Sequence, residues 1–400
     1  MWIEWNIAVK FLREGRSQTA LILVGIAVGV SVIVFITALI TGLQANIIER
    51  TLGTQAHIKI QSPDQVNRIL PAAIGTTQLV LEDKRPQRLR SINNWQQVIE
   101  TLDHLTKVVA VSPIVSGPAF ARRGESLQSV ALVGIDVARY QKIIPISDDI
   151  VAGQFRVGAG DAVIGKLLAD DLGLRVGDKL RLDAGLEGYS VVNVAGIFEL
   201  GVRELDSRYV YLDLKQAQSL LNLPGGVTVI DVTVQDIFAA DVTAAKIGRL
   251  TGLKSESWMQ TNTQLMNALT SQSLSTSMIS LFVALSVAFG IASVLSVSVV
   301  QRTREIGILR AMGTTQKQML LVFLIQGALY GLAGSLLGSM AGYGLVWAFN
   351  TLGPGLFYIP VSSTLVPMAM AIATITGVLS AAIPARRAAR LDPVVAIRYV

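Results

Sequence analysis

The chain has 400 residues, of which 51% are hydrophobic and only 16% are charged, whereas soluble domains contain about 25% charged residues. Charged residues and histidines are absent from residues 17–48, 257–301 and 318–385. This composition excludes an ordinary soluble protein and predicts a chain that spans a membrane.

The first 18 residues predict an amphipathic helix. Trp2, Trp5, Val9 and Leu12 recur every three or four residues and therefore share one helical face. Tryptophans beside cations suit a helix that lies at a membrane surface. We therefore expect residues 1–18 to form an interfacial helix, with a soluble helical cap as the alternative.

Four segments are long and apolar enough to cross a bilayer, whose core of about 30 Å requires roughly 20 helical residues. The third charge-free stretch holds two spans, because Gly353, Pro354, Gly355 and Pro360 interrupt it at 350–363. The first apolar run is longer than the apolar core of a signal peptide. The predicted transmembrane helices are residues 19–43, 278–300, 319–349 and 364–385.

The Lys and Arg residues near the spans predict their orientation. Cations precede the first span, lie in segment 301–318 and follow the last span in tail 386–400, whereas loop 350–363 has none. By the positive-inside rule, both termini and segment 301–318 face the cytoplasm. Residues 44–272 then lie outside with a net charge of −1, and the rest of the chain carries +7. The basic balance thus reflects topology, and no nucleic-acid partner is expected.

The outer region, residues 44–272, mixes strand and helix patterns. Segments such as 189–198 and 227–234 alternate and are β-branched, which indicates strands, while 241–250 reads as a helix. A second subdomain is expected to be inserted at about 136–224. The predicted fold class is an α-helical membrane protein, with four transmembrane helices and a large α+β extracytoplasmic domain.

Residues with catalytic or metal-binding patterns are scarce. GDAVIGKL (160–167) is similar to a phosphate-binding loop, but Leu167 stands where such a loop has Ser or Thr to hold magnesium. His57 and His104, the two histidines, have no companion ligand at metal spacing. We expect no catalytic residue, no metal site and no ATPase activity in this chain.

Glycines four residues apart recur in the first and third spans. Small residues at this spacing let helix backbones approach closely, so we predict helix packing there, within the chain or across a dimer. The predicted packing residues are Gly25, Gly29, Gly327, Gly331, Gly334, Gly338 and Gly342.

The segment RTREIGILRAMGTT, which begins at Arg302, resembles a signature of the FtsX/MacB-like permeases of ABC transporters. The tail PARRAARLDPVVAIRYV, which begins at Pro384, is similar to that family's ending, with Ile397 where Leu is usual. The order of one helix, a large outer domain and three further helices is also the family's. Within the family, VIGKLLADDLGLRVGDKLRL (163–182) looks closest to the lipoprotein-releasing (Lol) permeases.

The resemblance implies a permease subunit that forms a homodimer or heterodimer. It would work with a cytoplasmic ATPase dimer, which binds the ATP and Mg. Closure of that dimer would push on segment 301–318, and the first two spans would carry the motion to the outer domain. The residues expected to couple to the ATPase are Arg304, Glu305, Ile306, Leu309, Arg310 and Gly313.

The resemblance further implies a lipoprotein cargo, lifted from the membrane lipid and handed to a periplasmic chaperone or adaptor. Apolar outer ends of the first two spans would receive the acyl chains. This predicted cavity consists of Phe35, Leu39, Leu43, Met278, Phe282 and Leu285. The alternatives are a MacB-like tripartite efflux permease and an FtsX-like signalling protein that activates a cell-wall hydrolase.

Overall fold

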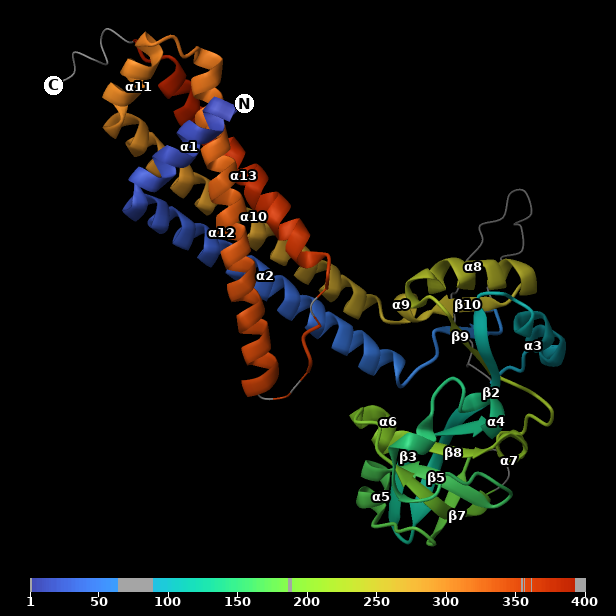
Figure 1. The fold of residues 1–400 in the computed structure, drawn as a ribbon. Coiled ribbons are helices and arrows are strands. Elements are labelled where there is room, and N and C mark those ends of the chain that lie inside the picture. The colour runs from blue at the N-terminus through green and yellow to red at the C-terminus, as the bar shows by residue number, and fades with distance from the viewer. Residues whose placement is uncertain are drawn as a thin grey trace, which may run out of the picture. The chain divides into compact units, whose positions relative to one another are not determined.

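The computed structural model describes residues 2–63, 89–185, 189–353, 355, 357–360 and 362–392. The chain forms two compact units (Figure 1). We call Met1–Glu49 together with Leu265–Val400 the transmembrane unit, and Arg50–Gln264 the β-rich unit.

The transmembrane unit is built from helices. In the described part of the chain, four helices are long and apolar enough to cross a membrane. They are α2 (Arg16–Leu52), α10 (Thr263–Gln301), α12 (Gln316–Leu352) and α13 (Leu365–Ala389). Two shorter helices, α1 (Trp2–Glu14) and α11 (Thr303–Ala311), lie together at one end of these four (Figure 1).

The long helices extend beyond the apolar segments that predicted them. Helix α10 has 39 residues and α2 has 37, or about 55–60 Å at 1.5 Å per residue. A bilayer core of about 30 Å accounts for only part of that length. Apolar composition marks the part of a helix that lipid can surround, and polar residues such as those of 263–277 continue the same helix.

Helix α12 meets its neighbours through glycines. A Cβ on Gly327 would lie 2.4 Å from the carbonyl oxygen of Gly377 in α13, and one on Gly331 would lie 2.6 Å from that of Ala373. Further along α12, glycines 334, 338 and 342 face α2, where a Cβ would overlap Ile26, Val30 and Val34. These backbones can therefore approach closely only because glycine has no side chain.

The two glycines of α2 differ from each other. A Cβ on Gly29 would lie 2.6 Å from Val287 of α10, so this glycine lets α2 and α10 approach. Nothing lies within 4 Å of the Cβ position of Gly25. The packing predicted for Gly25 is therefore not made within the described chain, because its side of α2 is left open.

The β-rich unit contains one sheet of ten strands among the described residues. The strands are β1 (Ile58–Gln61), β2 (Val108–Arg123), β3 (Ser126–Ile135), β4 (Ile150–Gly153), β5 (Asp161–Gly165), β6 (Lys179–Asp183), β7 (Tyr189–Phe198), β8 (Tyr209–Asp213), β9 (Val229–Val234) and β10 (Lys254–Ser257). Their order is β10-β1-β9-β2-β3-β8-β5-β7-β4, and β6 pairs with both β2 and β7. Strands β2, β3, β8, β5, β7 and β6 consequently form a closed ring.

Short helices accompany these strands. They are α3 (Trp95–Asp103), α4 (Val137–Tyr140), α5 (Lys166–Leu172), α6 (Arg203–Arg208), α7 (Leu214–Leu220), α8 (Ala240–Thr251) and α9 (Trp258–Thr261). A core that includes Phe198 and Tyr211 is buried among the ring strands and the neighbouring α4. The centroids of the Phe198 and Tyr211 aromatic rings are 5.3 Å apart in an edge-on arrangement, which aromatic pairs favour.

The expected insertion at about 136–224 does not coincide with a break in the sheet. Strands β2 and β3 precede residue 136, yet they pair with β6 and β8, which lie inside the proposed insertion. The first part of β2 pairs with β9 and its later part with β6. One long strand thus belongs to both parts of the sheet, and alternation along a sequence does not reveal which strands it will pair with.

Candidate functional site: the joint of α1, α2, α10 and α11

Helix α11 begins and ends at sharp turns. A single residue, Arg302, separates it from α10. At its other end Gly313 has a φ of +103°, its N–H donates to the carbonyl of Arg310, and the Thr314 N–H donates to that of Leu309. This pair of hydrogen bonds is the Schellman arrangement, in which a left-handed glycine closes a helix. The predicted role of Gly313 in ending the helix matches this geometry.

The two sides of α11 have different surroundings. Ile306 is fully buried and Leu309 packs against the same core cluster of the transmembrane unit. The opposite side carries two exposed apolar side chains, Ile308 at 42% and Met312 at 73% exposure, which sequence reasoning missed. We call Arg304, Glu305, Ile308 and Met312 the exposed α11 face. Ile306 and Leu309, two of the predicted ATPase-coupling residues, therefore pack α11 into the core of the transmembrane unit.

Arg310 has an internal partner. Its Nη1 donates a hydrogen bond to the carbonyl oxygen of Leu391, just beyond the end of α13. A cation beside the free carbonyls at a helix C-terminus is favourable. Arg310 thus ties the last turn of α11 to α13, so it holds the helix in place and is not a free docking group.

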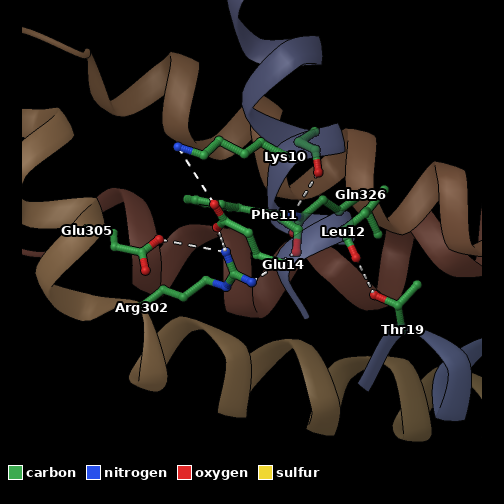
Figure 2. Close-up of polar contacts among 9 residues, drawn as sticks. Lys10, Phe11, Leu12, Glu14, Thr19, Arg302, Glu305 and Gln326 are labelled. Carbon is green, nitrogen blue, oxygen red and sulfur yellow. Dashed lines mark hydrogen bonds and ion pairs between the residues drawn. The ribbon is translucent and has the colours of Figure 1, made fainter. Parts of the chain in front are cut away.

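Arg302 links α11 to α1 (Figure 2). Its Nη1 lies 3.1 Å from a carboxylate oxygen of Glu14 and its Nη2 donates to the carbonyl of Phe11 at 3.0 Å. The guanidinium carbon lies 4.6 Å from the centre of the Phe11 ring. Glu305 lies 3.7 Å from Nη1, and Lys10 lies 3.7 Å from Glu14. Charges therefore alternate in sign along a chain of four side chains.

The bend between α1 and α2 is held against α12. The Thr19 hydroxyl donates to the carbonyl of Leu12 at 3.0 Å and lies 3.3 Å from the hydroxyl of Tyr330. The amide of Gln326 donates to the carbonyl of Ala8 at 3.4 Å. Helix α1 is therefore docked on the unit through Ala8 and Phe11, whereas Trp5, on the predicted membrane-facing side, is exposed.

The predicted acyl-chain cavity is not assembled in the structure. Phe35 and Leu39 pack against a small core cluster that contains Val346 and Ile359. Their counterparts on α10 are exposed instead, namely Met278, Phe282 and Leu285. Phe357 and Ile359, which follow α12, pack on this side of α2. Leu43 is partly buried on α2.

An apolar groove lies elsewhere between α2 and α10. It measures about 570 Å³ and is nearer to the ends marked by Arg16 and Gln301. Gly25 and Gly290 line it, and no atom lies within 4 Å of either Cβ position. Phe282 is the only residue of the predicted cavity that lines this groove.

The phosphate-loop-like segment, residues 160–167, contains all of β5 and the first two residues of α5. The Lys166 ammonium lies 2.7 Å from a carboxylate oxygen of Glu199, and this hydrogen bond raises the pKa of Lys166. A Cβ on Gly165 would lie 2.1 Å from the backbone oxygen of Asp206. The junction of β5 and α5 is thus packed against α6, and its lysine already has an anionic partner within the chain.

Four apolar helices, a charged helix between two of them and a β-rich unit define the class of multi-pass inner-membrane permeases. The chain belongs to the FtsX/MacB-like permeases of ABC transporters. The profile of the MacB-like periplasmic core domain matches residues 19–250, and that of the FtsX-like permease C-terminal region matches residues 277–393. Subunits of this kind are non-catalytic permeases.

Two kinds of protein are similar to this chain over nearly its whole length, lipoprotein-releasing proteins and macrolide exporters. The lipoprotein-releasing system transmembrane protein LolC of Neisseria meningitidis serogroup B is 23% identical over 99% of both chains. The macrolide export ATP-binding/permease protein MacB of Acinetobacter baylyi is 27% identical, over 98% of this chain and 59% of that protein. The solved periplasmic region of MacB from Actinobacillus actinomycetemcomitans matches 55% of this chain and 96% of that one, with 13% identity and a TM-score of 0.36.

Proposed function

We propose that the chain couples ATP hydrolysis by a separate cytoplasmic ATPase to movement of its β-rich unit, and that it extracts lipoproteins from the inner membrane. Relatives named for lipoprotein release match over 98–99% of both chains, whereas the macrolide exporter matches over 59% of its length. The Lys and Arg distribution supports cytoplasmic termini and a cytoplasmic α11, with the β-rich unit in the periplasm.

The exposed α11 face is the single observation that carries the coupling proposal. On this face, Ile308 and Met312 are exposed beside Arg304 and Glu305. Apolar residues at the centre with charged residues around them are the composition of a protein–protein interface with a polar rim. The helix behind it is held at both ends, by Arg302 and by Arg310. A force on this face is therefore passed to the helices instead of bending a loop.

Co-purification tests the docking of the ATPase. We expect the double variant Ile308→Glu, Met312→Glu to weaken binding of the co-expressed ATPase about 10- to 100-fold, because buried apolar anchors dominate interfaces. The matched control is Val242→Glu, Leu250→Glu, two exposed aliphatic residues of α8, which should leave binding unchanged. Normal binding by the α11 variant would remove this face from the interface.

Lipid extraction needs an energy source, since each buried methylene contributes about 0.8 kcal/mol to membrane anchoring. We propose that acyl chains contact the groove between α2 and α10 together with the exposed α10 side chains Met278, Phe282 and Leu285. Phe35 and Leu39 are already packed within the chain, and are left out of this proposed surface.

Reconstitution tests the cargo. The chain and its ATPase would be placed in vesicles with a fluorescent triacylated lipopeptide and, in parallel, with a macrolide. ATP-dependent transfer of the lipopeptide to a soluble acyl-chain-binding protein is the expected result. Movement of the macrolide alone would support the efflux alternative, and movement of neither would support a signalling role.

We propose that the outer surface of the strand ring is the site that binds the periplasmic chaperone or adaptor. Arg122 of β2 lies directly opposite Arg181 of β6, and like charges placed so are unfavourable. Among the described residues neither arginine forms an ion pair. Arg181 stacks on Tyr189 at 3.8 Å, and Phe120 is exposed beside them. We propose that an acidic surface of the partner binds here.

A further inference from the structure

We infer that Arg302 is the positioning residue that makes α1 and the N-terminal end of α2 move together with α11. The inference rests on the proposed coupling to an ATPase and adds the route by which motion leaves α11. It concerns a side chain that lies outside the exposed α11 face.

The Arg302 side chain makes nearly all of its contacts within the protein. It is only 11% exposed, although it belongs to the residue that joins α10 to α11. It contacts the last turn of α1 in three ways, through the Glu14 carboxylate, the Phe11 carbonyl and the Phe11 ring. Guanidinium groups hold such geometry better than ammonium groups, because their donors form a rigid planar fork.

The neighbouring residue makes a second bridge. The side-chain oxygen of Gln301 accepts a hydrogen bond from the Gln18 amide, at 2.6 Å. Consecutive residues at the α10–α11 corner therefore hold consecutive turns around the α1–α2 bend. One bridge is charged and the other is neutral, so their contributions can be separated by mutation.

Helix α2 connects the α10–α11 corner to the β-rich unit along the chain. It continues without a break from Arg16, beside the corner, to Leu52, which belongs to the β-rich unit. A displacement of α11 that also moves α1 and Arg16 would therefore act on α2 directly. Without the Arg302 bridge, the same displacement would reach α2 only through helix packing.

A cleft beside the bridge makes the idea testable by chemistry. It measures about 800 Å³ and is lined by side chains that include Lys10, Glu14, Gln18 and Arg302. A thiol-reactive cross-linker can reach it, and the chain contains no cysteine of its own. The ion pair can therefore be replaced by a covalent link at Glu14→Cys, Arg302→Cys without removing other thiols.

The central experiment uses the complex of the chain with its ATPase in vesicles. We expect Arg302→Ala to bind the ATPase normally and to keep basal hydrolysis, while lipopeptide-stimulated hydrolysis falls about 5- to 150-fold, the usual range of coupling between sites. Arg302→Lys should restore part of the stimulation, and Gln18→Ala should lose less than Arg302→Ala. A flexible bismaleimide across Glu14→Cys, Arg302→Cys should restore stimulation that the unlinked pair lacks.

A structural role without coupling predicts other results. Wild-type stimulation in Arg302→Ala, or a linked variant that stays unstimulated while its complex is intact, would overturn the inference. Loss of folding in Arg302→Ala would be recognised by its melting temperature, and the cross-linked pair, which keeps α1 attached, would then decide.

A distance measurement separates this inference from the proposed function. Spin labels at Arg13→Cys and Ala311→Cys, both exposed, report the separation of α1 and α11 with and without nucleotide. We expect a constant separation in the otherwise unchanged chain and a nucleotide-dependent one after Arg302→Ala. If the separation changes with nucleotide in the chain that keeps Arg302, the inference is overturned even where lipopeptide is transported. If the separation stays constant there, the inference is supported even where lipopeptide is not the cargo.

Discussion

The two units are stabilised by different kinds of contact. In the β-rich unit the strands of a closed ring pack against α4 through aromatic side chains, among them Tyr140, Phe198 and Tyr211. In the transmembrane unit the helices meet at glycines, and long-range polar contacts gather around Arg302 and Gln326. Closure removes free strand edges, whereas helices packed through small residues keep their hydrogen bonds when they shift. We therefore expect the β-rich unit to move as a body and the transmembrane helices to supply the motion.

The largest expected effect is in the aromatic core between the ring strands and α4. Phe198→Ala removes a fully buried ring and should destabilise the β-rich unit by about 3–5 kcal/mol. Hydrogen exchange followed by mass spectrometry on the full chain resolves each unit separately. Protection should fall in the ring strands and remain in α12 and α13. Phe120→Ala, the same change at an exposed position, serves as the control; equal losses for both variants would contradict the assigned core.

Glycine packing should be tested in the transmembrane unit. Gly327→Val places a side chain where a Cβ already lies 2.4 Å from the Gly377 oxygen, and overpacking of this kind costs about 1–3 kcal/mol. Thermal unfolding in detergent is the measurement. Gly25→Val has nothing within 4 Å of its Cβ and should have little effect. A melting temperature for Gly327→Val equal to that of Gly25→Val would show that α12 and α13 are not closely packed.

A buried carboxyl group gives the β-rich unit a pH dependence. Asp231 lies opposite Ser112 and Lys59 on neighbouring strands, one of its oxygens has no hydrogen-bond partner, and burial raises its pKa to about 6. A raised pKa means that the folded state favours the protonated form. Its contribution to stability is therefore complete below the unfolded pKa of about 3.9 and is lost as the pH rises through about 6.

Asp231→Asn should consequently stabilise the β-rich unit at pH 7.5, by on the order of 1–3 kcal/mol, and should flatten its stability between pH 4 and 7. Urea unfolding at a series of pH values, read by hydrogen exchange, measures this. Asp171→Asn, at an exposed position, is the control and should leave the pH profile unchanged. An unchanged profile for Asp231→Asn as well would show that this carboxyl group is not desolvated.

The smallest expected effect is at the end of α11. Gly313 has a φ of +103° and nothing within 4 Å of its Cβ position, so Gly313→Ala costs only backbone strain, about 1–2 kcal/mol. Faster hydrogen exchange in the last turn of α11 is the expected result. Gly290→Ala, which also has open space but lies within α10, should show no such change. Identical exchange in both variants would mean that the left-handed turn is not required.

The sequence by itself determined the four transmembrane segments, the mixed fold of the outer domain and the family resemblance. Apolar length and charge distribution are summed properties of local segments, and they do not depend on which elements become neighbours. The same reasoning located Gly313 at a helix end, because a glycine after an amphipathic turn indicates a left-handed cap.

Only the tertiary structure decided which side of α11 is free and what its charges contact. Periodicity shows that a helix has two faces, but Ile306 is buried and Ile308 exposed because α11 packs on one particular core. Arg302 contacts residues nearly three hundred positions away, and no local pattern encodes such a pairing. The ring closure through β6 and the covering of Phe35 have the same origin, since both depend on segments that are distant in sequence and adjacent only after folding.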